Sequence, residues 1–175
     1  MNISFVMTLL GKDQPGIIEA ISAVVEAHGG NWQESQMARL AGRFTGFISI
    51  SAPEANALDL EKSLLALAHD ELDLRVERVD KTIPEAAVRR ASLEILGQDR
   101  PGILREITAA LSSAGVNVTR LNTGCTSAPM SGETLFRAEA ELLCPATLSF
   151  ESLREALEQL GQDMMVDITL DETRN

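Results

Sequence analysis

Two short segments of this chain are identical at five of their eight positions. Gly11–Ile18 reads GKDQPGII and Gly97–Leu104 reads GQDRPGIL, so the second begins 86 residues after the first. The same offset relates three further pairs of residues, which are Ile21 and Ile107, Gly29 and Gly115, and Asn31 and Asn117. An internal repeat of this length indicates that one structural unit occurs twice. The fold is therefore restricted to two similar domains, each large enough to fold by itself.

The repeat also predicts where the domains begin and end. We expect a first domain at residues 1–82, a linker at 83–88 and a second domain at 89–175. Hydrophobic residues make up 45% of the chain, and this is typical of a globular protein. The N-terminal segment MNISFVMTLLG lacks the basic region of a signal peptide and is too short to span a bilayer. We therefore expect a cytoplasmic protein without membrane contact.

The charge balance argues against direct binding to nucleic acid. The chain has 15 Lys and Arg against 26 Asp and Glu, which gives a net charge of −11. A phosphate backbone repels such a chain unless its basic residues cluster, and Arg89 and Arg90 form the only adjacent basic pair. Aromatic residues are only 3% of the chain and Tyr is absent, so no platform for stacking single-stranded bases is expected.

The residues that most often carry catalysis or bind metal are scarce. Cys125 and Cys144 both lie in the second repeat without counterparts in the first, so no disulfide framework or zinc motif is indicated. His28 and His69 are the only histidines, and neither lies beside a candidate nucleophile. We expect no catalytic residue, no metal site and no cofactor, and hence a protein that is not an enzyme.

Hydrophobic periodicity predicts the same order of elements in both repeats. Alternating apolar residues predict strands, and apolar residues at helical spacing after each Pro-Gly pair predict helices with Pro in the first turn. Each unit then reads strand, helix, strand, strand, helix, strand, which is the ferredoxin-like arrangement. Further predicted segments are strands at 31–40, 72–79, 117–126 and 165–170, a turn at Ala41-Gly42, and a mobile loop at Thr123–Glu133.

The predicted fold class is therefore α+β. We expect two domains, each with an antiparallel four-stranded sheet and its helices on one face. Since the expected linker is short, we also expect the domains to pack side by side.

The repeated loop places groups that could bind a carboxylate next to a group that could bind an ammonium. The first amide groups of a helix lack partners and carry the positive end of the helix dipole, so the residues near Gly16 and Gly102 could attract a carboxylate. A carboxylate from Asp13 or Asp99 nearby would suit an ammonium group. The combination predicts a receptor for an α-amino acid.

A purely structural interpretation of the same residues stays open. The loop glycines and prolines could serve only to turn the chain, and Asp13 and Asp99 could be ordinary helix caps. Asn31 and Asn117 could bind a ligand from the next strand, or could simply begin that strand.

The loop, the glycine turn after the helix and the Asn that opens the next strand resemble the ACT domain, a small amino-acid-sensing module. Two such modules that account for nearly all 175 residues are similar to the glycine cleavage system transcriptional repressor family, as is the segment Glu34–Leu40. The resemblance implies ligands at an interface between two modules, against the loop and the start of the helix. The implied ligand-binding residues are Gly11, Asp13, Gly16, Ile17 and Asn31 in the first domain and Gly97, Asp99, Gly102, Ile103 and Asn117 in the second.

The resemblance further implies a non-enzymatic repressor of glycine cleavage genes. Such a protein binds a DNA-bound transcriptional activator and is released by glycine, with serine as a second candidate ligand. Lys12 and Gln14 correspond to Gln98 and Arg100, so the two loops need not bind equally. A structural adaptor without a small-molecule ligand and a regulatory subunit of an amino-acid or one-carbon enzyme remain alternatives, and a homodimer is left open.

Overall fold

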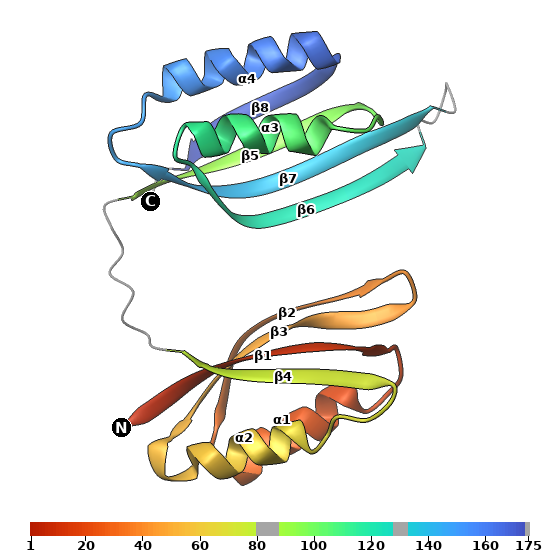
Figure 1. Cartoon of the computed structure of the whole chain (residues 1–175), viewed down its shortest axis with the longest axis vertical. Coiled ribbons are helices and arrows are strands. Elements are labelled where there is room, and N and C mark those ends of the chain that lie inside the picture. The colour runs from red at the N-terminus through yellow and green to blue at the C-terminus, as the bar shows by residue number, and fades with distance from the viewer. Residues whose placement is uncertain (80–87, 128–132, 174–175) are drawn as a thin grey trace. The chain divides into compact units, whose positions relative to one another are not determined.

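The computed structural model describes residues 1–79, 88–127 and 133–173. It contains the strand, helix, strand, strand, helix, strand unit twice, as the repeat predicts (Figure 1). The chain divides into two compact units, Met1–Pro84 (the first unit) and Glu85–Asn175 (the second unit). Apart from Val88, which begins a strand, the expected linker 83–88 lies outside the described residues.

The elements of the two units correspond one to one. The first unit has β1 (Asn2–Lys12), α1 (Ile17–Ala27), β2 (Asn31–Leu40), β3 (Arg43–Pro53), a 3-10 turn (Glu54–Asn56), α2 (Ala57–Leu65) and β4 (Leu72–Val79). The second has β5 (Val88–Gln98), α3 (Ile103–Ser113), β6 (Asn117–Ser127), β7 (Thr134–Pro145), α4 (Phe150–Met164) and β8 (Val166–Thr173). None of these helices combines the length and the hydrophobicity needed to cross a lipid bilayer.

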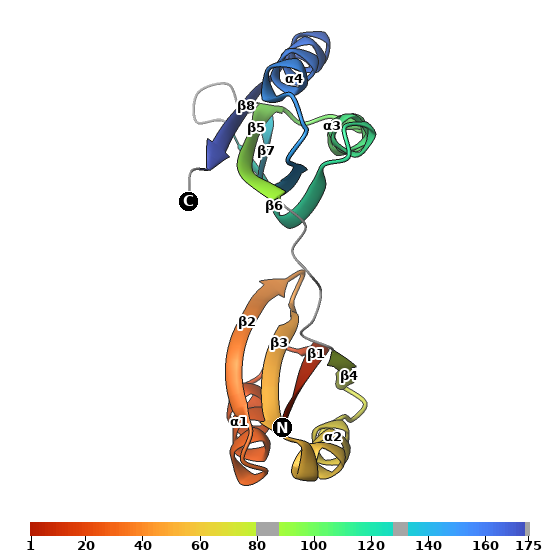
Figure 2. The same cartoon turned by 90° about the vertical axis from the view of Figure 1, so that its left-hand side faces the viewer.

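Each unit is one antiparallel four-stranded sheet with two helices on one face. The strand order is β2-β3-β1-β4 in the first unit and β6-β7-β5-β8 in the second. Figure 2 shows α1 and α2 on the same side of the first sheet, and Figure 1 shows α3 and α4 together on one side of the second. The predicted α+β, ferredoxin-like fold is confirmed.

The core of each unit lies between the sheet and its helices. Alternate residues of β1 and β5 point toward the helices, which contribute residues at helical spacing. The buried residues are Phe5, Met7 and Leu9 of β1 with Ile17, Ile21 and Val25 of α1, and Leu93 and Ile95 of β5 with Ile103, Ile107 and Leu111 of α3. Burial of these side chains is the main source of stability for each unit.

The hairpin that joins β2 to β3 and the hairpin that joins β6 to β7 differ in length. In the first unit the turn is Ala41-Gly42, as predicted, and both residues have positive φ, 48° and 79°. Such a turn matches the twist of the two strands. In the second unit the prediction of a loop over Thr123–Glu133 is wrong for its first part. Residues 123–127 belong to β6 and pair with 134–138, because ladder hydrogen bonds outweigh the turn-like composition, while 128–132 lie outside the described residues.

Gly11 and Gly97 lie inside β1 and β5, where no turn requires them. A Cβ on Gly11 would lie 2.8 Å from the Glu71 carbonyl oxygen and 2.8 Å from Leu72 Cδ1. A Cβ on Gly97 would lie 2.8 Å from Val166 Cβ. Glycine is therefore needed at both positions because the neighbouring strand begins against it, which differs from the turn-forming role that the sequence suggested.

We expect Gly97→Ala to lower the free energy of unfolding by about 1 to 3 kcal/mol, since the added methyl group overpacks the contact with Val166. Gly124→Ala on β6 is the matched control, because a Cβ there meets nothing within 4 Å. Urea unfolding of both variants measures the difference. Equal destabilisation of the two variants would show that the contact with Val166 does not require glycine.

Candidate functional site

Each repeated loop leads from the end of a sheet strand into a helix through a left-handed glycine. Gly16 caps α1 with φ 97°, and Gly102 caps α3 with φ 100°. The prediction that proline occupies the first helical turn is wrong, because the helices begin at Ile17 and Ile103, after the glycines. Only glycine adopts this backbone conformation without strain.

Gly16 and Gly102 occupy the cap positions and provide no side-chain hydrogen bond to the start of α1 or α3. The interpretation of Asp13 and Asp99 as helix caps is therefore wrong. The first hydrogen bonds within the helices are donated by Ala20 to the Gly16 carbonyl, at 2.9 Å, and by Glu106 to the Gly102 carbonyl, at 3.0 Å. The amide groups that precede Ala20 and Glu106 have no acceptor within the helix and remain able to bind an anion.

A groove of about 770 Å³ lies beside the start of α1. It is lined by the loop, by the first turns of the helix and by one aromatic residue of β3. The lining residues are Asp13, Gln14, Pro15, Gly16, Ile17, Ile18, Glu19, Ser22 and Phe44. We call it the first-unit groove. It combines unpaired amides, two carboxylates, a hydroxyl and an apolar surface in one place.

An arginine of β2 that the sequence analysis did not identify forms an ion pair with a residue that lines this groove. Arg39 Nε lies 3.2 Å from Asp13 Oδ2, and the side chains are 70% and 39% exposed. Arg39 is also directly opposite Phe44, which lines the groove. An ion pair this exposed contributes only about 0 to 1 kcal/mol to stability. It is therefore easily opened.

The topology of the fold would have identified Arg39. β1 and β2 both pair antiparallel to β3, so they run in the same direction and end at the same edge of the sheet. A charged residue at the end of β2 must then lie close to the loop that follows β1.

The strand register identifies the equivalent positions in the second unit. Phe44 pairs with both Gly11 and Arg39, and Phe136 pairs with both Gly97 and Cys125. Cys125 therefore occupies the position of Arg39. In the loop, the Asp99 backbone N–H donates to the Thr134 carbonyl at 2.8 Å.

Of the five site residues predicted in the first unit, Asp13, Gly16 and Ile17 line the groove, whereas Gly11 and Asn31 are not among its lining residues. Asn31 pairs with Ser51 on β3, whereas Gly11 pairs with Phe44 on the same strand. Seven residues of extended strand separate the two positions by roughly 24 Å. The same spacing separates Asn117 from Gly97, since their partners on β7 are Leu143 and Phe136.

The predicted site residues before and at the start of each helix do not all face solvent. They are Gly11, Asp13, Gly16 and Ile17 in the first unit and Gly97, Asp99, Gly102 and Ile103 in the second. The Ile17 and Ile103 side chains are buried in the cores, so only their backbone can contact a ligand.

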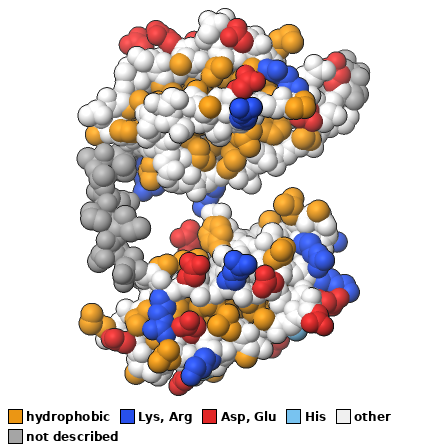
Figure 3. Space-filling model, viewed as in Figure 1, with side chains coloured by type: hydrophobic (Ala, Val, Ile, Leu, Met, Phe, Trp, Pro, Cys, Tyr) orange, Lys and Arg blue, Asp and Glu red, His pale blue; other side chains and the backbone are white. Residues whose placement is uncertain are grey.

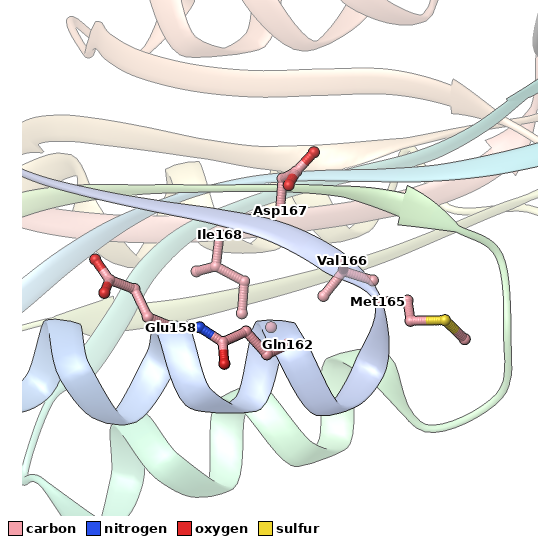
Figure 4. Close-up of a pocket in the computed structure, with 7 residues that line it drawn as sticks. Glu158, Gln162, Met165, Val166, Asp167 and Ile168 are labelled. Carbon is pink, nitrogen blue, oxygen red and sulfur yellow. The ribbon is translucent and has the colours of Figure 1, made fainter.

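Another hollow, of about 360 Å³, lies between the end of α4 and β8 (Figure 4). Gly161 lines this hollow, and a Cβ there would lie 2.7 Å from the Val166 carbonyl oxygen, so glycine allows α4 to approach the start of β8 closely. In Figure 4 the Asp167 carboxylate points away from α4. This hollow therefore lacks the convergent charged groups of the first-unit groove.

The two cysteines differ in environment. Cys125 is exposed, whereas Cys144 is fully buried in the second core. Burial raises the pKa of the Cys144 thiol above its ordinary value, partly offset by the nearby Arg89 guanidinium. Within the described ranges, no group of three or more His, Cys, Asp or Glu side chains is placed to hold a metal ion.

Comparison with known sequences finds the same domain in each unit. The sequence profile of the ACT domain matches residues 4–79 and, separately, residues 91–141. Each match includes the repeated loop and the helix that follows it.

The chain is also similar to known proteins over most of its length. The glycine cleavage system transcriptional repressors of Escherichia coli (strain K12) and Shigella flexneri are each 27% identical over 161 residues, which cover 91% of this chain and 84% of the relative. The crystal structure of an unknown protein from Galdieria sulphuraria matches with a TM-score of 0.85 and 28% identity, over 99% of this chain and 100% of that one.

We expect one thiol of the native chain to react with Ellman's reagent and two after unfolding in guanidinium. Cys125 is exposed, whereas Cys144 is shielded and its raised pKa further reduces the reactive thiolate. Absorbance measured during the reaction counts both thiols. Cys125→Ser should abolish the native signal, and a rapid native reaction of this variant would contradict the buried position of Cys144.

Proposed function

Because this chain belongs to the ACT-domain family and carries two such domains in tandem, we propose that it is a non-enzymatic regulatory protein that responds to a small amino acid. The supporting observation is the first-unit groove. There the Asp13 carboxylate, the Arg39 guanidinium and the unpaired amides at the start of α1 lie together. An α-amino acid carries an ammonium and a carboxylate on one carbon, so it requires adjacent groups of opposite charge.

We propose glycine, with serine as the alternative, as the ligand. The support is the similarity to curated proteins named as glycine cleavage system transcriptional repressors. The groove is open, so it suits a small ligand that is held by its α-ammonium and α-carboxylate groups. Asn31 and Asn117 join the proposed site only if they come from another ACT unit, since within one unit they lie at the far end of the sheet.

The proposed regulatory output is repression through a protein partner. A net charge of −11 disfavours contact with a phosphate backbone. On the face in Figure 3, Lys and Arg side chains lie among Asp and Glu side chains rather than in one basic patch. We therefore propose that the chain binds a DNA-bound transcriptional activator in the cytoplasm and that the amino acid releases it.

A structural role for His28 fits a protein that is not an enzyme. Its Nδ1 lies 2.8 Å from the Val24 carbonyl oxygen, and its Nε2 lies 3.2 Å from Ser63 Oγ. The ring therefore links the end of α1 to α2, at the opposite end of α1 from the groove.

We expect glycine or serine, alone among the common amino acids, to raise the thermal unfolding temperature of the purified chain. A ligand at 100 times its dissociation constant adds about 2.7 kcal/mol. This corresponds to a shift of several degrees in a protein of this size. Differential scanning fluorimetry with an amino-acid panel measures the shift.

The double variant Asp13→Ala, Asp99→Ala should lose this response while its ligand-free melting temperature stays close to that of wild type. Asp73→Ala, an exposed change on β4, is the matched control and should keep the response. If the double variant responds as wild type does, the loops are not the sensing sites.

We further expect the chain alone not to bind DNA. At about 50 mM salt, where phosphate contacts are strongest, micromolar protein should leave the mobility of a duplex unchanged in a gel-shift assay. A shift that disappears as salt is added would contradict the proposed protein partner and indicate direct DNA contact.

A further inference from the structure

The two loops share a backbone but differ in charge. Around the first-unit groove the charged side chains are Asp13 and Glu19, together with Arg39 on the adjoining strand. The repeat places Asp99, Arg105 and Cys125 at the same three positions of the second unit, and Arg100 replaces Gln14. One carboxylate becomes a cation, and the guanidinium on the strand becomes a neutral thiol.

The Asp13–Arg39 pair presents two adjacent side chains of opposite charge, as recognition of a zwitterion requires. The atoms are 3.2 Å apart at the edge of the groove, and both side chains are exposed enough to exchange partners. An entering amino acid can place its carboxylate on Arg39 and its ammonium on Asp13. One exposed ion pair is then replaced by two charge-assisted contacts.

The second unit does not present this pair. Among the described residues, no cation lies within ion-pair distance of the Asp99 carboxylate. The strand position that would supply it holds Cys125, whose side chain is shorter and uncharged. The cations Arg100 and Arg105 belong to the loop and the helix, so neither is held opposite Phe136 by the sheet register.

We propose that the first-unit groove is the amino-acid site of this chain and that Arg39 determines it by binding the ligand carboxylate. The equivalent loop of the second unit is a weak site or none, because Cys125 stands in place of that arginine. This inference rests on the proposed amino-acid response and assigns it to one of the two units.

Isothermal titration of the full chain with glycine, and separately with serine, under reducing conditions tests the assignment. The wild-type chain should bind one ligand per chain. Arg39→Gln should weaken binding by roughly 10- to 100-fold, the effect of losing one charge-assisted contact, which corresponds to about 1.4 to 2.8 kcal/mol. Arg75→Gln, an exposed arginine on β4 away from the groove, should bind as wild type does.

A gain-of-function variant makes the test independent of any damage caused by Arg39→Gln. Cys125→Arg restores the missing guanidinium at an exposed position, so it should raise the stoichiometry from one ligand to two. Arg39→Gln combined with Cys125→Arg should again bind one ligand, now in the second unit. Thermal unfolding without ligand confirms that each variant is folded.

The outcomes separate this inference from the proposed function. Wild-type binding of two ligands would overturn the assignment of the site to one unit. Binding by Arg39→Gln with unchanged affinity would overturn the role of Arg39. Either result would leave the amino-acid response intact. An unchanged stoichiometry in Cys125→Arg would likewise overturn the explanation for the second unit. Binding of neither glycine nor serine to the wild-type chain would overturn the proposed ligands and this inference together.

Discussion

Burial of one face of a central strand beneath two helices is the constraint on which each unit depends. In β1 and β5 alternate side chains lie in the core, and each strand is followed within a few residues by a helix that packs on the same face. The chain then has only the loop residues after Lys12 or Gln98 in which to turn back toward the helix. A left-handed glycine completes the turn and occupies the cap position, so the cap residue has no side chain that could accept from the first amides of the helix.

The candidate site is a consequence of this turn and of the strand order. Because β1 and β2 run in the same direction, the loop after one lies beside the end of the other. The side chain at that end of β2 can therefore alter the chemistry of the loop without altering the fold. Arg39 and Cys125 occupy this position in the two units, and both are exposed, so neither is constrained by packing.

The duplication thus preserves the architecture and changes the chemistry. Core positions are apolar in both units, whereas the positions around the groove differ in charge. If the proposed amino-acid site lies in the first unit alone, the second unit is available for contact with a partner. This division of roles is compatible with the acidic charge of the chain and with its similarity to curated transcriptional repressors.

The sequence by itself determined the repeat, the order of elements and the segments 31–40 and 72–79, which β2 and β4 match to the residue. These features depend on local periodicity and turn chemistry, which a single sequence records. Only the tertiary structure decided that Gly11 is needed for strand contact, that Arg39 adjoins Asp13 and that Asn31 lies far from the loop. Those relations depend on strand order and register. They bring together residues that are distant in the sequence, and they place far apart some residues that belong to the same sequence motif.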